Sequence, residues 1–464
     1  MLGRVADNRI ELSEVHRIPN APIRRTNGWH WDVNRLFAEV LLGLRQAADQ
    51  AELHGISVDT WGVDYGLLDR HGELKDEPFS YRDERTLPMV VVAESQIPAE
   101  RLYRMTGCQA IPINTLYQLL ADQRAGRLED ASRFLLTPDL FAYWLTGVVG
   151  ADESIASTSQ LFDPVARDWC WEVIDAMNLP RRIFAPIRQT GTVLGTVLRD
   201  LPLPAGIPVV TAAGHDTAAA FAAATGDADQ LVISIGTWSL VGVELTEPLI
   251  SETGREANFT NEIGVLGTIR YLRNAPGLWL IQECLREWHE RGETMAWADL
   301  IASAGQSPAF ASLFDPDDRR FMEPGPMAER ITAAGDGLFD GRHGAIVRSV
   351  LESLSMNHRW LLETVERNLG RPLGRIRIVG GGAQNRLLCQ MTADATGLPV
   401  VAGPAEAAAI GNIAMQAIAT GQITDLATAR DLIDRSFPAV RYEPDPDHGL
   451  WDIEYERWRA LVSR

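Results

Sequence analysis

The chain has 464 residues, more than a single hydrophobic core usually supports, so two domains are expected. Its formal net charge is -19 and no basic stretch offsets it, which argues against nucleic acid and anionic membranes as partners. Four widely spaced cysteines, the absence of a bilayer-length apolar run and a start without a signal peptide's apolar core favour a reduced cytoplasm.

The first half alternates strand-like and helix-like patterns, which indicates an α/β protein. Residues 1–6 and 9–18 are strand-like, and the Asp7-Asn8 pair between them favours a tight turn. Residues 31–55 then carry apolar side chains at helical spacing, so they predict a helix that Gly55 ends.

Two polar clusters follow this helix. Residues 56–62 predict a buried strand that ends in a loop, and residues 65–74 predict a hairpin. For the loop residues Asp59, Trp61, Gly62 and Asp64, a structural role and a binding role are equally supported, because ligands gather at the carboxyl ends of such strands. Residues 81–86 crowd two arginines with two acids and predict a solvated salt-bridge surface.

One imidazole and one carboxylate stand alone in a run of alanines. Residues 208–216 indicate a strand, a glycine and a helix start, which puts His215 and Asp216 at the strand's carboxyl end. A carboxylate there could take the proton of a sugar hydroxyl during attack on a phosphoryl group, although Asp216 could also simply cap its helix. A hydrolase using this pair is a weaker alternative, because no G-x-S-x-G elbow accompanies it.

The second half contains two glycine-rich turns. Residues 230–245 predict two strands around Gly236-Thr237, and residues 376–385 predict a strand followed by Gly380–Gly382. Glycines let backbone amides approach a phosphate or a ribose closely, but each turn alone is weak evidence and neither matches a dinucleotide fingerprint or a P-loop. Further helices are predicted over residues 345–370 and 406–419.

As a set, these segments resemble the FGGY carbohydrate kinases, within the sugar kinase, hexokinase, actin and Hsp70 fold superfamily. The resemblance covers nearly the whole chain and is carried, in the family's order, by the motifs "GHDTAAA", "SIGTWSLVG", "VGGGAQN" and "GPAEAAAIGNIAMQ". It implies two ribonuclease H-like α/β domains with a cleft between them. The sugar-binding domain is expected at residues 1–224 and the nucleotide-binding domain at residues 225–464.

The resemblance also implies an activity, the ATP-dependent phosphorylation of a ketose with Mg²⁺ as cofactor. The motifs "DTWGVDYGLLD", "YRDERT", "NTLYQL", "TNEIG" and "RNAPGLWLIQE" are most similar to family members that phosphorylate the 1-hydroxyl of L-rhamnulose. Another ketose, such as fuculose or xylulose, and a non-catalytic sugar-binding protein remain alternatives. The expected partners are a sugar and a nucleotide, and the chain is expected to be a monomer or a homodimer.

Residue roles follow from the matched motifs. The resemblance implies that Asp216 is the general base and that it binds the sugar together with Gly62, His215, Thr217 and Asn274. For the nucleotide it implies a phosphate contact from Thr237 and ATP contacts from Gln282, Gly380, Gly381 and Gly382. No metal ligand is assigned.

The start of the chain departs from the family pattern. The family begins with a strand, an acidic phosphate turn and a return strand, whereas this chain begins at the return strand. We therefore expect the first strand and the phosphate turn of the N-terminal domain to be missing. A start codon placed too far downstream is the favoured explanation over a true truncation, because the other site residues are intact.

Overall fold

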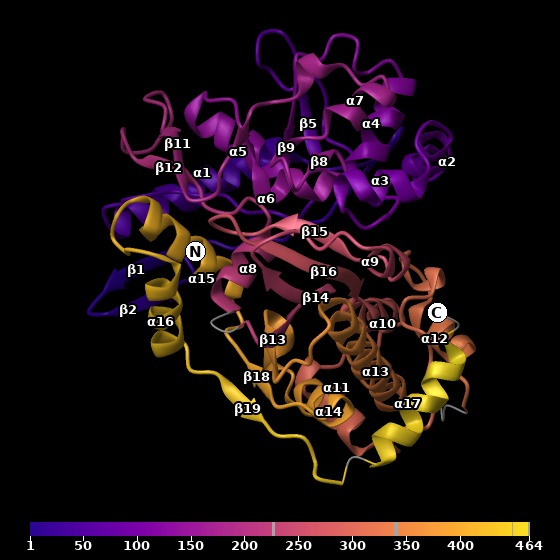
Figure 1. Ribbon diagram of the computed structural model, residues 1–464. Coiled ribbons are helices and arrows are strands. Elements are labelled where there is room, and N and C mark those ends of the chain that lie inside the picture. The colour runs from indigo at the N-terminus through magenta and orange to yellow at the C-terminus, as the bar shows by residue number, and fades with distance from the viewer. Residues whose placement is uncertain (225–227, 338–341, 448, 463–464) are drawn as a thin grey trace. The chain divides into compact units, whose positions relative to one another are not determined.

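The computed structural model describes residues 1–224, 228–337, 342–447 and 449–462. Helices and strands are mixed along the chain, which confirms the α/β class (Figure 1). The chain divides into two compact units, each built from several segments. The first unit contains Met1–Gly226, Glu244–Leu272 and Ala407–Ser436, and the second contains Asp227–Val243, Arg273–Glu406 and Phe437–Arg464. The predicted domain limits meet between residues 224 and 225, next to the gap at 225–227 in the described ranges, and they stay a prediction.

The first unit begins with the predicted hairpin. Strands β1 (Leu2–Ala6) and β2 (Arg9–Ser13) pair in antiparallel register, from Leu2 opposite Ser13 to Ala6 opposite Arg9. Asp7 and Asn8 both have positive φ, 49° and 61°, as a two-residue hairpin turn of the primed type requires. The hairpin is therefore confirmed, while the expectation of a missing strand before it stays a prediction.

The predicted first helix is present but shorter than expected. Helix α1 (Val33–Gln50) starts where the Asp32 side chain accepts a hydrogen bond from the backbone of Arg35. It ends before Gly55 because Ala51 already adopts an extended backbone. Its apolar face lies against the core, as the spacing of its aliphatic residues predicts.

The other elements of the first unit are mostly short. Its strands are β3 (Ile23–Arg25), β4 (Gly28–His30), β5 (Tyr65–Leu68), β6 (Arg133–Leu136), β7 (Ala151–Asp152), β8 (Phe162–Asp163), β9 (Asp168–Trp169), β10 (Ile187–Arg188), β11 (Thr192–Thr196), β12 (Pro208–Thr211) and β15 (Thr260–Ile263). Its helices are η1 (Glu84–Thr86), α2 (Leu87–Gln96), α3 (Ala99–Thr106), α4 (Thr115–Arg124), α5 (Thr137–Thr146), α6 (Glu153–Ala156), η2 (Ser157–Ser159), α7 (Trp171–Ala176), η3 (Arg181–Ile183), α8 (Asp216–Ala224), α9 (Glu252–Glu256), α15 (Ala407–Ala419) and α16 (Leu426–Ser436).

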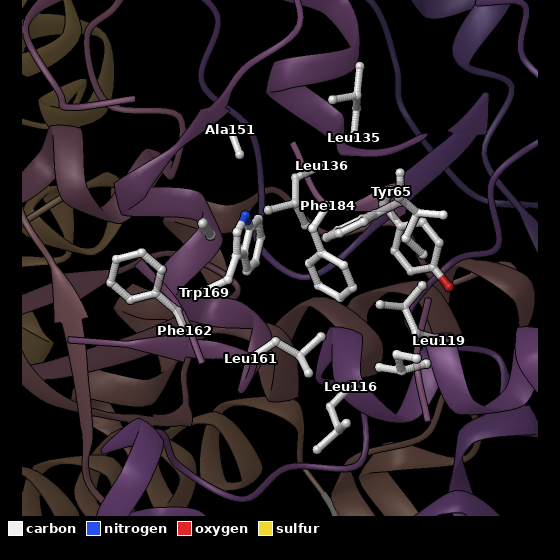
Figure 2. Packing of buried hydrophobic residues seen from close by; sticks show 14 of the residues in the cluster. Tyr65, Leu116, Leu119, Leu135, Leu136, Ala151, Leu161, Phe162, Trp169 and Phe184 are labelled. Carbon is white, nitrogen blue, oxygen red and sulfur yellow. The ribbon is translucent and has the colours of Figure 1, made fainter. Parts of the chain in front are cut away.

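An aromatic cluster fills the core of the first unit (Figure 2). The rings of Phe134 and Phe184 meet edge to face with centroids 5.0 Å apart, and Trp169 packs against both. Edge-to-face contacts of this kind stabilise a core beyond the effect of buried area alone. The cluster anchors β5, β6 and the loops that lead from them toward the site residues.

The predicted strand at residues 56–62 is only partly formed. It pairs in parallel with the segment around β12 at two separate places, Ile56 opposite Val209 and Thr60 opposite His215. The hairpin expected at residues 65–74 is likewise reduced to β5 and one bridge from Leu68 to Leu74, because β5 takes β6 as its main antiparallel partner. Both segments therefore adopt extended structure at the predicted positions, but their strand pairing is less regular than predicted.

The second unit contains a mixed sheet. Strands β13 (Gln230–Ile235), β17 (Arg375–Val379) and β18 (Val400–Ala402) are parallel neighbours, and β14 (Trp238–Leu245) and β19 (Val440–Tyr442) flank them in antiparallel register. Strands β14 and β16 (Ile269–Pro276) run through both units. The helices are α10 (Trp279–Glu290), α11 (Trp297–Gln306), η4 (Arg319–Phe321), α12 (Met327–Ala334), α13 (His343–Leu369), η5 (Gly381–Gln384), α14 (Arg386–Thr396) and α17 (Gly449–Leu461).

The alanine-rich helix α8 lies against α15 in the first unit (Figure 1). Residues 217–224 of α8 are all buried. A Cβ on Gly411 of α15 would lie 1.8 Å from the carbonyl oxygen of Ala219, so the two backbones are in direct contact. The small alanine side chains of α8 thus allow the close approach of a neighbouring element, as predicted, and that element is helix α15.

The remaining expectations from composition concern cysteines and membranes. All four cysteines are free and buried, which agrees with the expectation of no disulfide framework. Among the described residues, no helix combines the length and the apolar character that crossing a bilayer requires.

Candidate functional site

Backbone hydrogen bonds join the Gly62 loop to the turn that carries His215 and Asp216. The amide of Thr60 donates to the carbonyl of Gly214, and the amide of Asp216 donates to the carbonyl of Thr60, both at 2.9 Å. Ser154 accepts a third hydrogen bond at 3.2 Å, from the His215 amide. The structure therefore brings together the first-unit residues that the sequence motifs singled out.

Asp216 is the first residue of α8, and its side chain is 46% exposed although the rest of the helix is buried. The Thr217 hydroxyl donates to its Oδ1 at 3.2 Å, and Nε2 of His215 lies 3.5 Å from the same oxygen. Helix N-termini favour negatively charged groups, so this position suits a carboxylate. The arrangement leaves a carboxylate accessible to a ligand while its neighbours hold its orientation.

Asp59 is a second, partly buried carboxylate at this place. Its Oδ1 accepts a hydrogen bond of 2.6 Å from the Asn412 amide of α15. Burial, and then the negative charge of Asp216, raise the pKa of Asp59 to about 6, against the opposing effect of the Asn412 hydrogen bond. The charge on Asp216 therefore affects the ionisation of Asp59. The hydrogen bond with Asn412 connects the loop of Asp59 to helix α15.

Asp64 anchors the tryptophans beside the Gly62 loop. Its Oδ2 accepts hydrogen bonds from the indoles of Trp31 and Trp61, at 2.6 and 2.9 Å. Gln118 and the Tyr81 amide donate to the same carboxyl group, yet burial still raises the pKa of Asp64 to about 6. Trp61 also packs on Trp31 with ring centroids 4.5 Å apart. The half-buried Trp61 is therefore fixed rather than free to rotate.

Val63 carries backbone strain next to Gly62. Its φ is +70°, a conformation that β-branched residues rarely adopt. The Thr158 hydroxyl accepts from its amide at 3.3 Å, and the Thr115 hydroxyl donates to its carbonyl at 2.7 Å, so the surroundings impose the conformation. Strain held in this way is typical of functional loops.

Two buried charged residues beside His215 were missed by sequence reasoning. Glu262 of β15 and Arg270 of β16 form an ion pair of 3.0 Å, and Arg270 is fully buried. Nη2 of Arg270 lies 3.1 Å from Nδ1 of His215, and Glu262 Oε2 lies 3.3 Å from that nitrogen. Glu262 belongs to the motif "TNEIG", which served above only as part of the family resemblance. The residue pattern of one strand does not show which charged side chains will be buried next to each other.

The prediction of a solvated salt-bridge surface at residues 81–86 is wrong. Arg85 is largely buried and pairs with Asp122, whose side chain is 2% exposed. Arg127 pairs with the same carboxylate at 3.1 Å, and the Tyr65 hydroxyl donates to it at 2.6 Å. Asp83 caps η1 and accepts from a backbone amide of the neighbouring hairpin. Arg85 and Asp83 are therefore partnered inside the unit, which local sequence does not reveal, whereas Glu84 is exposed.

In the second unit, Thr237 and Gln282 lie together at the end of β13. The Thr237 hydroxyl donates to Gln282 Oε1 at 3.4 Å. Gly277 allows the two segments to approach, since a Cβ there would lie 2.5 Å from the Trp238 carbonyl carbon. Gly236, next to Thr237, faces open space. A hydroxyl and a glycine are thus exposed at a strand end, as the phosphate-contact prediction requires.

The second glycine turn lies beside the first. Strand β17 runs parallel to β13 with Val379 opposite Ser234, so Gly380–Gly382 follow at the same edge of the sheet. Gly380 has φ +82°, and a Cβ on Gly382 would lie 2.5 Å from the Ile235 side chain, whereas Gly381 faces open space. Parallel strand ends with glycine turns are a typical place for nucleotide phosphates and ribose.

The resemblance implies a sugar contact from Asn274 and assigns no metal ligand. Asn274 lies on the part of β16 that belongs to the second unit, so its role as a sugar contact stays a prediction. Among the described residues, no group of three or more histidine, cysteine or acidic side chains could hold a metal ion.

Two family models match the chain. The N-terminal domain model of the FGGY family of carbohydrate kinases matches residues 4–222, and the C-terminal domain model matches residues 231–420. Curated relatives match over nearly their whole length. A rhamnulokinase of Bacteroides thetaiotaomicron is 38% identical, covering 100% of this chain and 96% of the relative. A rhamnulokinase of Enterococcus faecalis is also 38% identical, covering 99% and 94%.

Solved structures resemble the chain at lower identity. A gluconate kinase from Lactobacillus acidophilus has a TM-score of 0.79 at 17% identity, covering 95% of this chain and 91% of that one. A xylulose kinase from Rhodospirillum rubrum has a TM-score of 0.78 at 20% identity, covering 96% and 92%. A Plasmodium falciparum glycerol kinase, solved with ADP, has a TM-score of 0.76 at 14% identity, with the same coverage of 96% and 92%.

Proposed function

Because the chain belongs to the FGGY family of carbohydrate kinases, we propose that it phosphorylates L-rhamnulose to L-rhamnulose 1-phosphate with ATP, a step of rhamnose catabolism. The fold similarity to solved sugar kinases confirms the predicted sugar kinase fold, and the family matches establish a carbohydrate kinase. The choice of L-rhamnulose is supported by curated rhamnulokinases at 35–38% identity that match at least 94% of the chain.

The observation that carries the mechanism is the exposed carboxylate of Asp216 at the start of an otherwise buried helix. We assign to it the role of general base. In this mechanism Asp216 takes the proton from the 1-hydroxyl of the ketose while that oxygen attacks the γ-phosphorus of ATP. The bond from this phosphorus to the β,γ-bridging oxygen breaks, and ADP is the leaving group. Proton transfer by a positioned side chain contributes about 10²–10⁴-fold to such a reaction.

The sugar is assigned to Gly62, His215, Thr217 and Asn274 together with Asp216. His215 and Thr217 flank the carboxylate with polar atoms, and Gly62 lies on the loop bonded to that turn. We further propose that Trp61 offers an apolar face to the deoxy end of the ketose. Asp64 and Trp31 hold this ring, which is a condition for distinguishing a methyl from a hydroxymethyl group.

ATP is assigned to the glycine turns of the second unit. Thr237 and Gln282 provide polar atoms for the phosphates, and Gly380, Gly381 and Gly382 provide a backbone surface without side chains. Gly236 and Gly381 face open space, so a nucleotide can approach the backbone there. Holding the reactants in line and stabilising charge is most of what phosphoryl transfer requires from a protein.

Mg²⁺ fits this site through the substrate. The ion is usually held by one or two carboxylates plus nucleotide phosphates, so the lack of a three-residue cluster among the described residues is compatible with it. When bound with ATP it neutralises charge that develops on the transferring phosphoryl group. We assign it no specific protein ligand. The cytoplasmic location and the monomeric or homodimeric state also stay predictions.

A coupled assay of ADP release tests the proposal. The purified chain is supplied with MgATP and, separately, with L-rhamnulose, L-fuculose and D-xylulose. We expect the highest kcat/KM with L-rhamnulose and no turnover without ATP. A clear preference for either other ketose would contradict the substrate assignment. Sugar binding by calorimetry without ADP release would instead favour a non-catalytic sugar-binding protein.

A further inference from the structure

Arg270 is placed to select the tautomer of His215. Its guanidinium is fully buried, and its Nε and Nη2 both donate to the carbonyl of Ile263, at 3.2 and 3.1 Å. Nη2 also meets Nδ1 of His215 at 3.1 Å. Glu262 lies 3.0 Å from the same Nη2, so the guanidinium is held from two sides. All of these groups belong to the first unit.

The arginine contact selects one tautomer of the imidazole. Oε2 of Glu262 lies 3.3 Å from Nδ1, but the guanidinium nitrogen is closer, at 3.1 Å. Because a guanidinium has donors and no acceptor, its hydrogen bond to His215 requires Nδ1 without a proton. A neutral ring then carries its proton on Nε2, and Nε2 is the atom that lies 3.5 Å from Oδ1 of Asp216. The other tautomer would turn a lone pair toward the carboxylate, which repels it.

We propose that Arg270, held by Glu262, is a positioning residue that acts through His215 on Asp216. By keeping the proton of His215 on Nε2, the ion pair presents an N–H group to Oδ1 of Asp216. This N–H group, 3.5 Å from Oδ1, orients the carboxylate together with the Thr217 hydroxyl, and the second oxygen stays available for the proton of the ketose. The inference deepens the proposed function and rests on the role of Asp216 as general base.

The ion pair between Glu262 and Arg270 is not explained by a contribution to the stability of the fold. Burying two charges carries a desolvation penalty, and apolar replacements of such pairs are often neutral or stabilising. Nη1 of Arg270 is buried without a hydrogen-bond partner in the described part of the chain, which adds a further cost. A functional role for the pair accounts for this unfavourable arrangement.

The test combines magnetic resonance with kinetics on the full chain. Histidine is labelled with ¹⁵N, and the variant His215→Asn identifies the signals of this ring. In the unmodified chain we expect Nε2 protonated and Nδ1 unprotonated. The double variant Glu262→Gln/Arg270→Gln removes both charges at once, so it avoids leaving one of them buried alone. In it we expect His215 to lose the strict Nε2–H form.

Kinetics are measured on the same proteins. We expect kcat with L-rhamnulose to fall about tenfold in the double variant, part of the contribution of a general base, with KM for ATP unchanged. Arg85→Gln is the matched control, because it breaks the buried pair with Asp122 elsewhere in the first unit. It should lower the melting temperature yet leave the His215 signals and kcat as they are.

The outcomes separate this inference from the proposed function. An unmodified chain that releases no ADP with any ketose contradicts the proposed function. An active chain contradicts the inference alone if His215 carries its proton on Nδ1, which requires no variant to detect. The inference is also contradicted if kcat of the double variant stays within about twofold of that of the unmodified chain. A loss of kcat in Arg85→Gln as large as that in the double variant would contradict it as well.

Discussion

The side-chain amide of Asn412 donates a 2.6 Å hydrogen bond to the carboxylate of Asp59, which is 353 positions earlier in the chain. Asn412 is itself oriented by Gln416, whose amide donates to its Oδ1 at 2.8 Å. The bond fastens the loop that leads to Gly62 to helix α15. Burial and the negative charge of Asp216 raise the pKa of this carboxyl group, and the Asn412 hydrogen bond opposes that rise.

Asp59→Asn should change how stability depends on pH. The pKa of Asp59 is raised from 3.8 to about 6, so its favourable contribution is complete below pH 3.8 and is lost as the pH rises through about 6. A shift of this size corresponds to about 3 kcal/mol. We expect the melting temperature of the unmodified chain to fall relative to that of the variant between about pH 4 and pH 7.

Thermal unfolding followed by circular dichroism over this pH range provides the measurement. Asp130→Asn, which removes an exposed carboxyl group in the same unit, is the control and should leave the profile unchanged. Parallel profiles of Asp59→Asn and the unmodified chain would show that Asp59 ionises as it does in the unfolded chain.

Asp216→Asn should abolish most of the turnover without preventing binding. The amide keeps the size of the side chain but cannot accept the proton of the ketose, so we expect kcat to fall by roughly 10²-fold or more. KM for L-rhamnulose should change much less, because asparagine still offers polar atoms to the sugar. ADP release at saturating substrate measures the loss, and near-normal turnover would exclude Asp216 as the base.

Trp61→Ala should weaken the preference for 6-deoxy ketoses. A methyl group in an apolar pocket is worth about 1–3 kcal/mol, so the ratio of kcat/KM between L-rhamnulose and a hydroxylated ketose should fall by about tenfold or more. Trp61→Phe keeps an apolar ring but loses the hydrogen bond to Asp64, and we expect an intermediate ratio. An unchanged ratio in Trp61→Ala would remove this residue from substrate selection.

Two alanine substitutions in one glycine turn should have different effects. A Cβ at Gly382 meets Ile235 at 2.5 Å, so Gly382→Ala should lower the melting temperature. A Cβ at Gly381 meets nothing within 4 Å, so Gly381→Ala should fold normally. If ATP lies against this turn, Gly381→Ala should raise KM for ATP several-fold while KM for L-rhamnulose stays constant. Equal KM values for ATP in Gly381→Ala and the unmodified chain would place the nucleotide elsewhere.

Much of the fold follows from local sequence signals. The Asp7-Asn8 turn, the long helix that ends at Gly370 with φ +68°, and the strands on both sides of Gly236-Thr237 are all present as predicted. Each depends on interactions within a few residues, such as left-handed turn conformations or a continuous apolar face. Such signals do not depend on where the rest of the chain lies.

The charge environment of the site could not be predicted in the same way. Arg85 pairs with Asp122 and Arg270 with Glu262, and neither pairing follows a local pattern. The strain at Val63 is imposed by Thr115 and Thr158, which come from other segments. Burial and pairing of these groups depend on tertiary contacts between distant segments. Patterns within a short stretch of one sequence do not reveal such contacts.

The contact between Gly411 and Ala219 has a consequence for synthesis in the cell. Helix α8, which presents Asp216, has its packing partner α15 nearly two hundred residues further along the chain. A ribosome makes the chain from its N-terminus, so α8 emerges long before α15 exists to cover its alanine face. The first unit can therefore reach its final packing only after the intervening second-unit segment has been translated.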